Sequence, residues 1–201
     1  MFGDGFARRM AARYRKHGLD KTARRMVDLL TARGIRGATV LEIGGGVGEI
    51  HLELLRRGAA SAINLELSPA YEAEASALIE EAGLNGRVHR RRVDIAEDPT
   101  GVEPADIVVL HRVVCCYPDY AKLLSAAADH AHRQLVFSHP PRNPASQALV
   151  ATQNLLFRLA GREFRTFVHP PAAMIAVLAE HGLHPTATHH GPVWHIAATA
   201  R

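Results

Sequence analysis

The sequence has little cysteine and no long uncharged apolar segment. Its two cysteines, Cys115 and Cys116, are adjacent, so they cannot form the disulfide framework of a small secreted domain. No apolar run approaches the roughly 18–20 residues that a membrane-spanning helix needs. The N-terminal segment also lacks the apolar core of a signal peptide. These absences predict a protein without a membrane span that works in the reducing cytoplasm.

Charged residues are ordinary in number but unevenly distributed. The chain of 201 residues is 47% hydrophobic and 22% charged, which is typical of one globular domain. Residues 1–36 contain ten Lys or Arg and three Asp, hence +7, whereas the whole chain carries +4. This segment indicates either a nucleic-acid or anionic partner, or the solvated faces of amphipathic helices. The helical spacing of Phe6, Met10 and Tyr14 favours the second interpretation and disfavours nucleic acid.

Short apolar segments alternate with amphipathic ones along most of the chain. Strands are predicted at 39–43, 61–65, 88–93, 106–110 and 134–137, and helices at 47–57, 69–82 and 118–132. Two more helices are predicted before residue 36, the second capped by Asp20. This alternation indicates βαβ units and a doubly wound, mainly parallel α/β sheet. The segments 184–190 and 193–200 flank Gly191-Pro192 and predict an antiparallel hairpin.

Residues 140–182 interrupt this alternation. A helix at 146–160, an aromatic segment at 164–168 and a helix at 171–181 are predicted there. We therefore expect a single domain, 1–201, made of three parts. The parts are an N-terminal helical lid at 1–36, a core at 38–139 and 183–201, and an insertion at 140–182 that caps the substrate.

A glycine cluster, residues 44–48, follows the first buried strand. Glycines between a strand and a helix let the backbone pass close to a ligand. The third glycine of the dinucleotide fingerprint is missing, because residue 49 is a glutamate, and no Gly-Lys-Ser/Thr of a phosphate-binding loop follows. Glu42, just before the cluster, would repel a pyrophosphate and suits a cationic ligand.

Two acidic residues follow the next two strands. Glu66 ends the second strand and Asp94 ends the third. A carboxylate in the first of these positions can accept both hydroxyls of a ribose. Because parallel strands end at one edge of a sheet, we expect both acids to meet the glycine cluster there.

Together these residues resemble the class I S-adenosylmethionine-dependent methyltransferases. The motifs are E-x-G-x-G-x-G at 42–48, Glu66 and Asp94, and the resemblance covers about residues 38–139 and the terminal hairpin. It implies a Rossmann-like seven-stranded sheet of order 3-2-1-4-5-7-6, with the last strand antiparallel. The third strand would then lie at the sheet edge, where Arg90-Arg91-Arg92 would oppose edge-to-edge pairing.

The resemblance also implies where S-adenosylmethionine binds. The donor-binding residues would be Glu42, Gly44, Gly45, Gly46, Gly48, Glu66, Leu67, Asp94, Ile95, His111 and Tyr14. Among them, Glu66 would bind the ribose hydroxyls, and Asp94 with Ile95 would flank the adenine. Tyr14 would close over the donor, although its apolar stripe is also typical of core packing.

In this family the end of the fourth strand lies below the reactive methyl group. His111 is therefore the first candidate for a general base or for a group that orients the acceptor; alternatively it only hydrogen-bonds the donor or the backbone. His139, after the fifth strand, is the second catalytic candidate, with a structural role as its alternative. Cys115 and Cys116 are expected to be buried near the acceptor, because an adjacent pair lacks the separated ligands of a zinc site. We expect no metal.

The acceptor is expected between the N-terminal helices and the insertion. Candidate acceptor-binding residues are Arg112, Cys115, Asn154, Arg165, Phe167 and His169. Aromatic side chains with a few polar groups suit a small organic molecule. The sequence thus predicts an enzyme, monomeric or homodimeric, that methylates an O, N or C nucleophile of a small molecule and releases S-adenosylhomocysteine. The alternatives are an RNA or protein methyltransferase and a non-catalytic donor-binding module.

Overall fold

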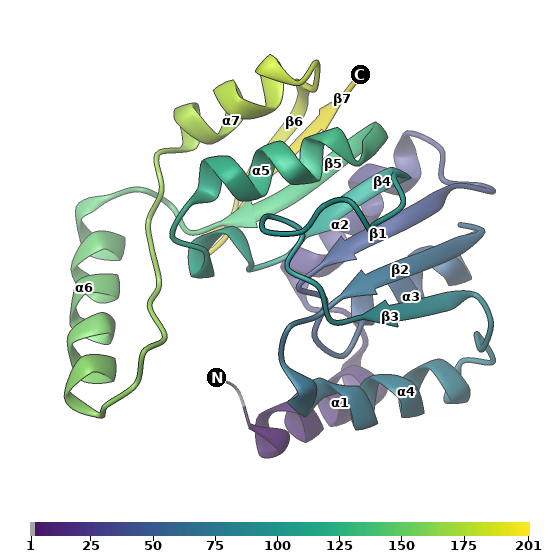
Figure 1. Ribbon diagram of the computed structural model, residues 1–201, viewed down its shortest axis with the longest axis horizontal. Helices are drawn as coiled ribbons and strands as arrows, with labels where there is room; N and C mark the ends of the chain where they lie inside the picture. Colours follow the sequence, from purple (N-terminus) through teal and green to yellow (C-terminus); the bar gives the residue numbers. More distant parts are fainter. Residues whose placement is uncertain (1–2) are drawn as a thin grey trace.

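The computed structural model describes residues 3–201, and a seven-stranded sheet forms its centre (Figure 1). The strands are β1 (Thr39–Ile43), β2 (Ser61–Leu65), β3 (Val88–Arg91), β4 (Ala105–Leu110), β5 (Ala131–His139), β6 (His184–His190) and β7 (His195–Ala200). Their order is β3-β2-β1-β4-β5-β7-β6. The first five strands pair in parallel, and β7 is antiparallel to both β5 and β6. The expected order and the antiparallel strand are confirmed.

Helices cover both faces of this sheet. They are α1 (Asp4–His17), α2 (Lys21–Ala32), α3 (Glu49–Arg56), α4 (Glu72–Glu81), α5 (Tyr120–Asp129), α6 (Pro144–Leu159) and α7 (Pro171–Glu180). In Figure 1, α5 and α7 lie in front of the sheet, and α2 and α3 lie behind it. Successive residues of β1, Val40 and Leu41, belong to the two different apolar cores on these faces, as the period of two along a strand requires. Within residues 3–201, no helix combines the length and the apolar character needed to cross a bilayer.

Several element boundaries differ from the sequence prediction. α3 begins at Glu49 rather than at residue 47, because Gly48 precedes it in the left-handed conformation, with φ +87°. β7 begins at His195 rather than at 193, because the N–H of Gly191 donates to the carbonyl of Trp194 and closes a turn there. β3 ends at Arg91, two residues earlier than expected.

The N-terminal helices form part of the helical layer. On α2, Ala23, Met26 and Val27 are fully buried. α1 contacts α4, and Arg15 of α1 forms ion pairs with acidic residues of α4. Acidic groups of the core thus neutralise part of the basic segment. A lid function for residues 1–36 stays a prediction.

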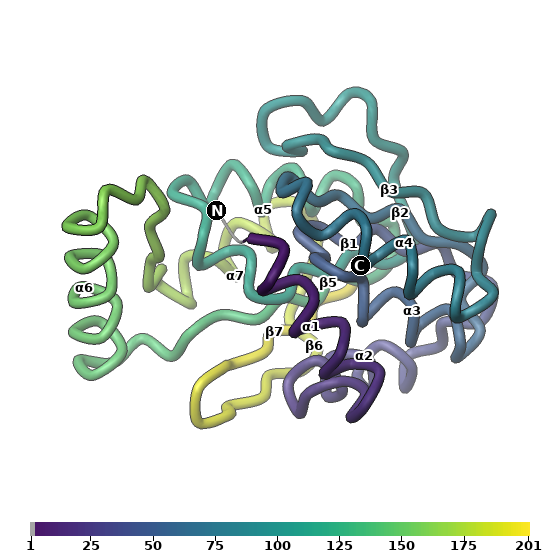
Figure 2. The backbone as a smooth tube through the Cα atoms, turned by 90° about the horizontal axis from the view of Figure 1, so that it is seen from below, coloured from purple at the N-terminus to yellow at the C-terminus, as the bar shows by residue number. Residues whose placement is uncertain are grey.

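The insertion is smaller than expected. α7 packs on α5 with Met174 and Leu178 fully buried, so it belongs to the core. Residues 140–170, which we call the cap, stand apart from the sheet at the left of Figure 1, and Figure 2 shows the same separation from below. The cap consists of α6 and a returning segment, the strap (residues 160–170). None of the 16 residues of α6 is buried.

Candidate active site

The glycine loop, residues 44–48, lies on a buried polar cluster. Glu42 is 1% exposed, and its Oε2 lies 2.5 Å from Nδ1 of the fully buried His51 on α3. The amide of Asn64, on β2, contacts both side chains, at 3.4 Å and 3.3 Å. A Cβ on Gly45 would collide with Asn64 and with the carboxylate of Glu42. Glu42 therefore supports the loop from within, and contact of its carboxylate with the donor stays a prediction.

Arg90 holds the same loop from the side of β3. Its side chain is only 9% exposed, and Nη1 donates to the carbonyl of Gly46 at 3.2 Å and to Oδ1 of Asn64 at 3.0 Å. Arg91 and Arg92 are exposed at the sheet edge, where the sequence placed all three arginines. Because alternate residues of a strand face opposite ways, Arg90 turns inward while Arg91 turns outward. That alternation is the signal by which the sequence could have singled out Arg90.

The two predicted acids meet the loop at the carboxyl edge of the sheet. Glu66 accepts the N–H of Gly46 at 2.9 Å and that of Ser68 at 2.8 Å. Asp94 accepts the N–H of Ala96 at 3.0 Å and the hydroxyl of Tyr117 at 3.1 Å. Both carboxylates are partly exposed and can accept further hydrogen bonds.

The loop and its neighbours fit a nucleoside with a cationic side arm. Gly46 has φ +55°, and a Cβ there would face the ring of Tyr71 at 3.5 Å, so the missing side chain leaves room beside an aromatic surface. Leu67 is 48% exposed and offers an apolar surface next to Glu66, whereas Ile95 is 1% exposed and forms part of the core below Asp94. Carboxylates and apolar side chains together suit ribose hydroxyls and a purine ring.

The chain is strained where β4 ends. Arg112 has φ +60° and is the only non-glycine residue with positive φ among residues 3–201. Ser138 Oγ accepts its N–H at 2.9 Å, and its guanidinium lies 5.2 Å from the ring centre of Trp194. Asp20, the N-cap of α2, pairs with Nη2 at 2.6 Å, so the turn between α1 and α2 reaches this edge of the site. Strain that is held by this many contacts is typical of functional residues.

His111, next to Arg112, presents a ring nitrogen that no described residue satisfies. Nδ1 lies 3.0 Å from Ser138 Oγ, while the buried Nε2 has no hydrogen-bond partner among residues 3–201. Burial, and then the charge of Arg112, lower the pKa of His111 from 6.5 to about 4. The ring is therefore neutral at pH 7, which suits a hydrogen bond to an acceptor group better than strong general-base catalysis.

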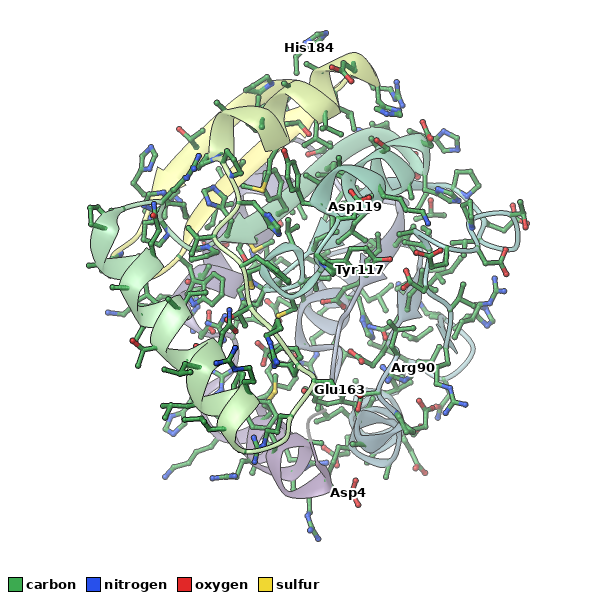
Figure 3. All side chains as sticks on the ribbon, turned by 60° about the vertical axis from the view of Figure 1, so that its left-hand side comes forward. Asp4, Arg90, Tyr117, Asp119, Glu163 and His184 are labelled. Carbon is green, nitrogen blue, oxygen red and sulfur yellow. The ribbon has the colours of Figure 1, made fainter. Side chains whose placement is uncertain are left out.

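A cavity of about 470 Å³ lies under the cap, next to Arg112. α6 contributes Val150 and Phe157, the strap contributes Phe167, and the turn before β7 contributes Trp194. In Figure 3, α6 crosses the front of the molecule at the lower left, and Glu163, to the right of its lower half, marks the strap. The apolar lining and the adjacent arginine suit an organic molecule with one polar or anionic end.

The predicted acceptor residues divide into two groups. Arg112, Cys115 and Phe167 line the cavity. The other three, Asn154, Arg165 and His169, do not line it. Each of them forms a side-chain hydrogen bond to a backbone carbonyl. For example, the amide of Asn154 both donates to and accepts from the backbone of Thr166, at 2.7 Å and 2.9 Å. The second group therefore shapes the cap, and its contact with the acceptor stays a prediction.

Tyr14 and His139 have contacts that match their structural alternatives. Tyr14 is 6% exposed, and its hydroxyl accepts a hydrogen bond from Arg56 at 2.9 Å. His139 is 6% exposed, its Nδ1 lies 2.9 Å from the carbonyl of Pro140, and it does not line the cavity. Donor contact for Tyr14 and catalysis by His139 stay predictions.

The cysteines are reduced in the structure. Cys115 is buried, Cys116 is partly buried, and both line the cavity with their sulfur atoms 3.7 Å apart. Within the described part of the chain, no three His, Cys, Asp or Glu side chains are grouped closely enough to bind a metal ion.

Comparisons with known proteins agree with this geometry. A family model described as a methyltransferase domain matches residues 11–187. No curated protein matches the sequence significantly. Among solved structures, magnesium protoporphyrin IX methyltransferase from Synechocystis PCC 6803 with bound S-adenosylhomocysteine is 22% identical, with a TM-score of 0.75 over 90% of this chain and 82% of its own.

Two further structures support the same fold. An O-methyltransferase family protein from Burkholderia thailandensis is 21% identical, with a TM-score of 0.74 over 98% of this chain and 59% of its own. A putative sarcosine dimethylglycine methyltransferase from Galdieria sulphuraria is 14% identical, with a TM-score of 0.72 over 90% of this chain and 85% of its own. On the family match and the shared fold, the chain belongs to the methyltransferase-domain family and is a class I S-adenosylmethionine-dependent methyltransferase.

Proposed function

We propose that this methyltransferase acts on a small, largely apolar organic molecule held in the cavity under the cap. The observation that carries the proposal is the position of this cavity, which adjoins Arg112 at the carboxyl end of β4 and is lined mainly by aliphatic and aromatic side chains. Two similar structures support the substrate class: one is a magnesium protoporphyrin IX methyltransferase, and another is an O-methyltransferase family 2 protein solved in complex with apigenin.

The donor would be held by residues on the β1, β2 and β3 side. The glycine loop would contact its amino-acid and ribose portions, Glu66 the ribose hydroxyls, and Asp94 the adenine end. When bound, S-adenosylmethionine supplies a methyl group on a positively charged sulfur. An O, N or C nucleophile can bond to the methyl carbon in line with the C–S bond, which breaks and leaves S-adenosylhomocysteine.

The chain's own residues would align the acceptor. The guanidinium of Arg112, which lines the cavity, can pair with an anionic group of the acceptor. The buried Nε2 of His111, next to Arg112 but outside the cavity lining, would meet a polar group of the acceptor only where the acceptor reaches past Arg112. Trp194 and Phe167 would exclude water from the cavity. Because correct alignment of two reactants supplies much of the rate gain in a bimolecular reaction, this positioning is the main catalytic contribution that we propose.

The alternatives receive less support. Arg15 pairs with acids of α4, and Arg13 pairs with Glu49 at 2.8 Å, so these basic side chains are engaged within the domain rather than arrayed for a nucleic acid. A cytoplasmic location, which rests on the inability of two adjacent cysteines to form a disulfide framework, and a monomeric or homodimeric state remain part of the proposal.

Calorimetric titration with S-adenosylhomocysteine tests the donor site. We expect saturable binding in the micromolar range, which Glu66→Ala weakens by about 100-fold, since a charged hydrogen-bonding group is lost at the ribose and at Gly46. Glu163→Ala, at the exposed start of the strap, is the matched control and should bind normally. Absence of binding by the folded wild-type protein at millimolar concentration would disprove donor binding.

Methyl transfer from labelled S-adenosylmethionine to a panel of apolar phenols and carboxylic acids tests the acceptor site. Trp194→Ala should lower kcat/KM for any active compound about tenfold and change the affinity for S-adenosylhomocysteine far less, because Trp194 lines the cavity and stacks on Arg112 but contacts no residue of the glycine loop. Activity on RNA or protein, with none on the panel, would overturn the proposed substrate class.

A further inference from the structure

The outer face of α6 is apolar and uncovered. Val150 and Phe157 on its inner face line the cavity. Leu155, Leu156 and Leu159 lie on the outer face and are 47%, 59% and 73% exposed. Single exposed leucines are common, but three on one face of one helix form a contiguous patch, which usually marks an interaction site. Figures 1 and 2 show α6 set away from the sheet, with no helix or strand of residues 3–201 covering that side.

The cap that carries this face is basic. Residues 140–170 contain four arginines and a single acidic residue, Glu163, hence a net charge of +3. Arg158 is the only charged residue within α6, and it is exposed. Arg142 precedes the helix, and Arg162 and Arg165 follow it. Apolar side chains flanked by arginines are the pattern of a helix that lies in a membrane interface beside anionic headgroups.

We propose that α6 docks on an anionic membrane surface. The helix, about 24 Å long at 1.5 Å per residue, would lie in the plane of the interface with its outer leucines inserted and the exposed Arg142 and Arg158 among the phosphates. Insertion and charge act together in this arrangement, as stable peripheral binding requires two signals. Such a helix lies on the membrane without spanning it.

The position of the cavity suggests what this docking would do for the reaction. The same helix has leucines on one side and the roof of the apolar cavity on the other, so an acceptor dissolved in the bilayer would have a short path into the site. This step rests on the proposed function, whereas the docking itself does not. A second copy of the chain could also cover this face. Two caps meeting through α6 would repel each other, however, because each carries a net charge of +3 and only one acidic residue.

Vesicle flotation tests the docking. The purified full chain is mixed with vesicles of phosphatidylcholine containing 30% phosphatidylglycerol, and in parallel with pure phosphatidylcholine. We expect flotation with the anionic vesicles, at least fivefold weaker binding to the neutral ones, and loss of binding as salt is raised. The double variant Leu155→Asp, Leu159→Asp should reduce binding at least tenfold.

Matched controls separate this effect from a general loss of fold or charge. Ala172→Asp with Ala176→Asp adds the same two charges on the exposed side of α7 and should float normally. Arg158→Glu should weaken binding several-fold, whereas Arg8→Glu, on the exposed side of α1, should not. All variants should keep the wild-type affinity for S-adenosylhomocysteine.

The outcomes are distinct. No flotation of a protein that binds S-adenosylhomocysteine overturns the docking and leaves the proposed function intact. A concentration-dependent dimer that Leu155→Asp with Leu159→Asp converts to monomer, with no vesicle binding, shows that α6 is a subunit interface instead. Flotation without S-adenosylhomocysteine binding would support the docking and count against the proposed function.

Discussion

The donor side and the acceptor side of this site are held in place by different kinds of contact. Under the glycine loop, the side chains of Glu42, His51 and Asn64 are almost completely buried and bonded to one another. Over the acceptor cavity, α6 has no buried residue, and the polar contacts of Asn154 with Thr166 join it to the strap. The residues under the glycine loop are therefore part of the core, whereas the cap packs against the core without burying any residue of α6.

This difference has a physical consequence for stability and for specificity. A buried polar network transmits any local change to the whole fold, because an unsatisfied group in the interior costs free energy. A cap with few buried contacts can open or change shape without unfolding the sheet. The four predictions below compare substitutions in these two regions, from the largest expected effect to the smallest.

Gly45→Ala should destabilise the whole protein. The added Cβ would collide with Asn64 and Glu42, so the buried cluster must break or shift. We expect a loss of roughly 2–4 kcal/mol in the free energy of unfolding, measured by denaturant titration. Gly5→Ala, with open space around its Cβ in α1, is the control and should cost nothing. Equal stabilities of the two variants would contradict the rigid donor side.

Arg90→Met should weaken the donor site specifically. It removes the hydrogen bonds to Gly46 and Asn64 but keeps the aliphatic stem. We expect about tenfold weaker binding of S-adenosylhomocysteine, equivalent to about 1.4 kcal/mol. Arg92→Met, at the exposed edge, should leave the affinity unchanged. If both variants aggregate and neither loses affinity for S-adenosylhomocysteine, Arg90 does not support the glycine loop and only prevents pairing at the β3 edge of the sheet.

Asn154→Ala should loosen the cap and nothing else. Its amide makes two hydrogen bonds to the backbone of Thr166, so the strap should open more easily by about 1–2 kcal/mol. Hydrogen exchange should become faster across residues 160–168, with the unfolding midpoint and the donor affinity unchanged. Gln147→Ala, exposed on α6, is the control. A fall in global stability as large as that of Gly45→Ala would show that the cap belongs to the core.

Glu49→Gln should alter how stability depends on pH. Burial, opposed by Arg13, raises the pKa of Glu49 from 4.5 to about 7, so the folded state holds a proton that the unfolded chain has already lost. The wild-type protein should therefore lose stability as pH rises from about 4.5 through 7, by about 1 kcal/mol after allowance for solvent around Arg13. The variant should lose less across that window. Parallel thermal unfolding curves from pH 4.5 to 8 would contradict the shift.

The sequence signals for the proposed donor side are local. A glycine loop after a buried strand and an acid after each of the next two strands meet at one edge in any parallel sheet. The structure places Glu66 and Asp94 there as expected. Arg90 and His51 were not assigned to the loop. The alternation along the strand could have marked Arg90 as facing inward, but neither its partners nor those of a histidine on a helix can be read from the neighbouring sequence.

The acceptor side was predicted only in part, since side chains of α6, the strap and the turn before β7 form it together. Arg112 and Phe167 line the cavity as expected, whereas Asn154 and His169 bond to backbone groups instead. Trp194 was not singled out, because nothing in the neighbouring sequence indicates that it stacks on Arg112. Aromatic residues in an insertion predict a pocket, but not which of them face it.

The sequence by itself determined the α/β class of the fold, because the period of apolar residues acts over a few residues, while its resemblance to a known family supplied the strand order and the proposed place of the donor. Only the tertiary structure decided that α7 joins the core, that Arg90 supports the glycine loop, that Arg112 is strained, and that α6 is left uncovered. These features depend on which side chains meet across distant segments, and burial and hydrogen-bond satisfaction are settled only when the whole chain is packed.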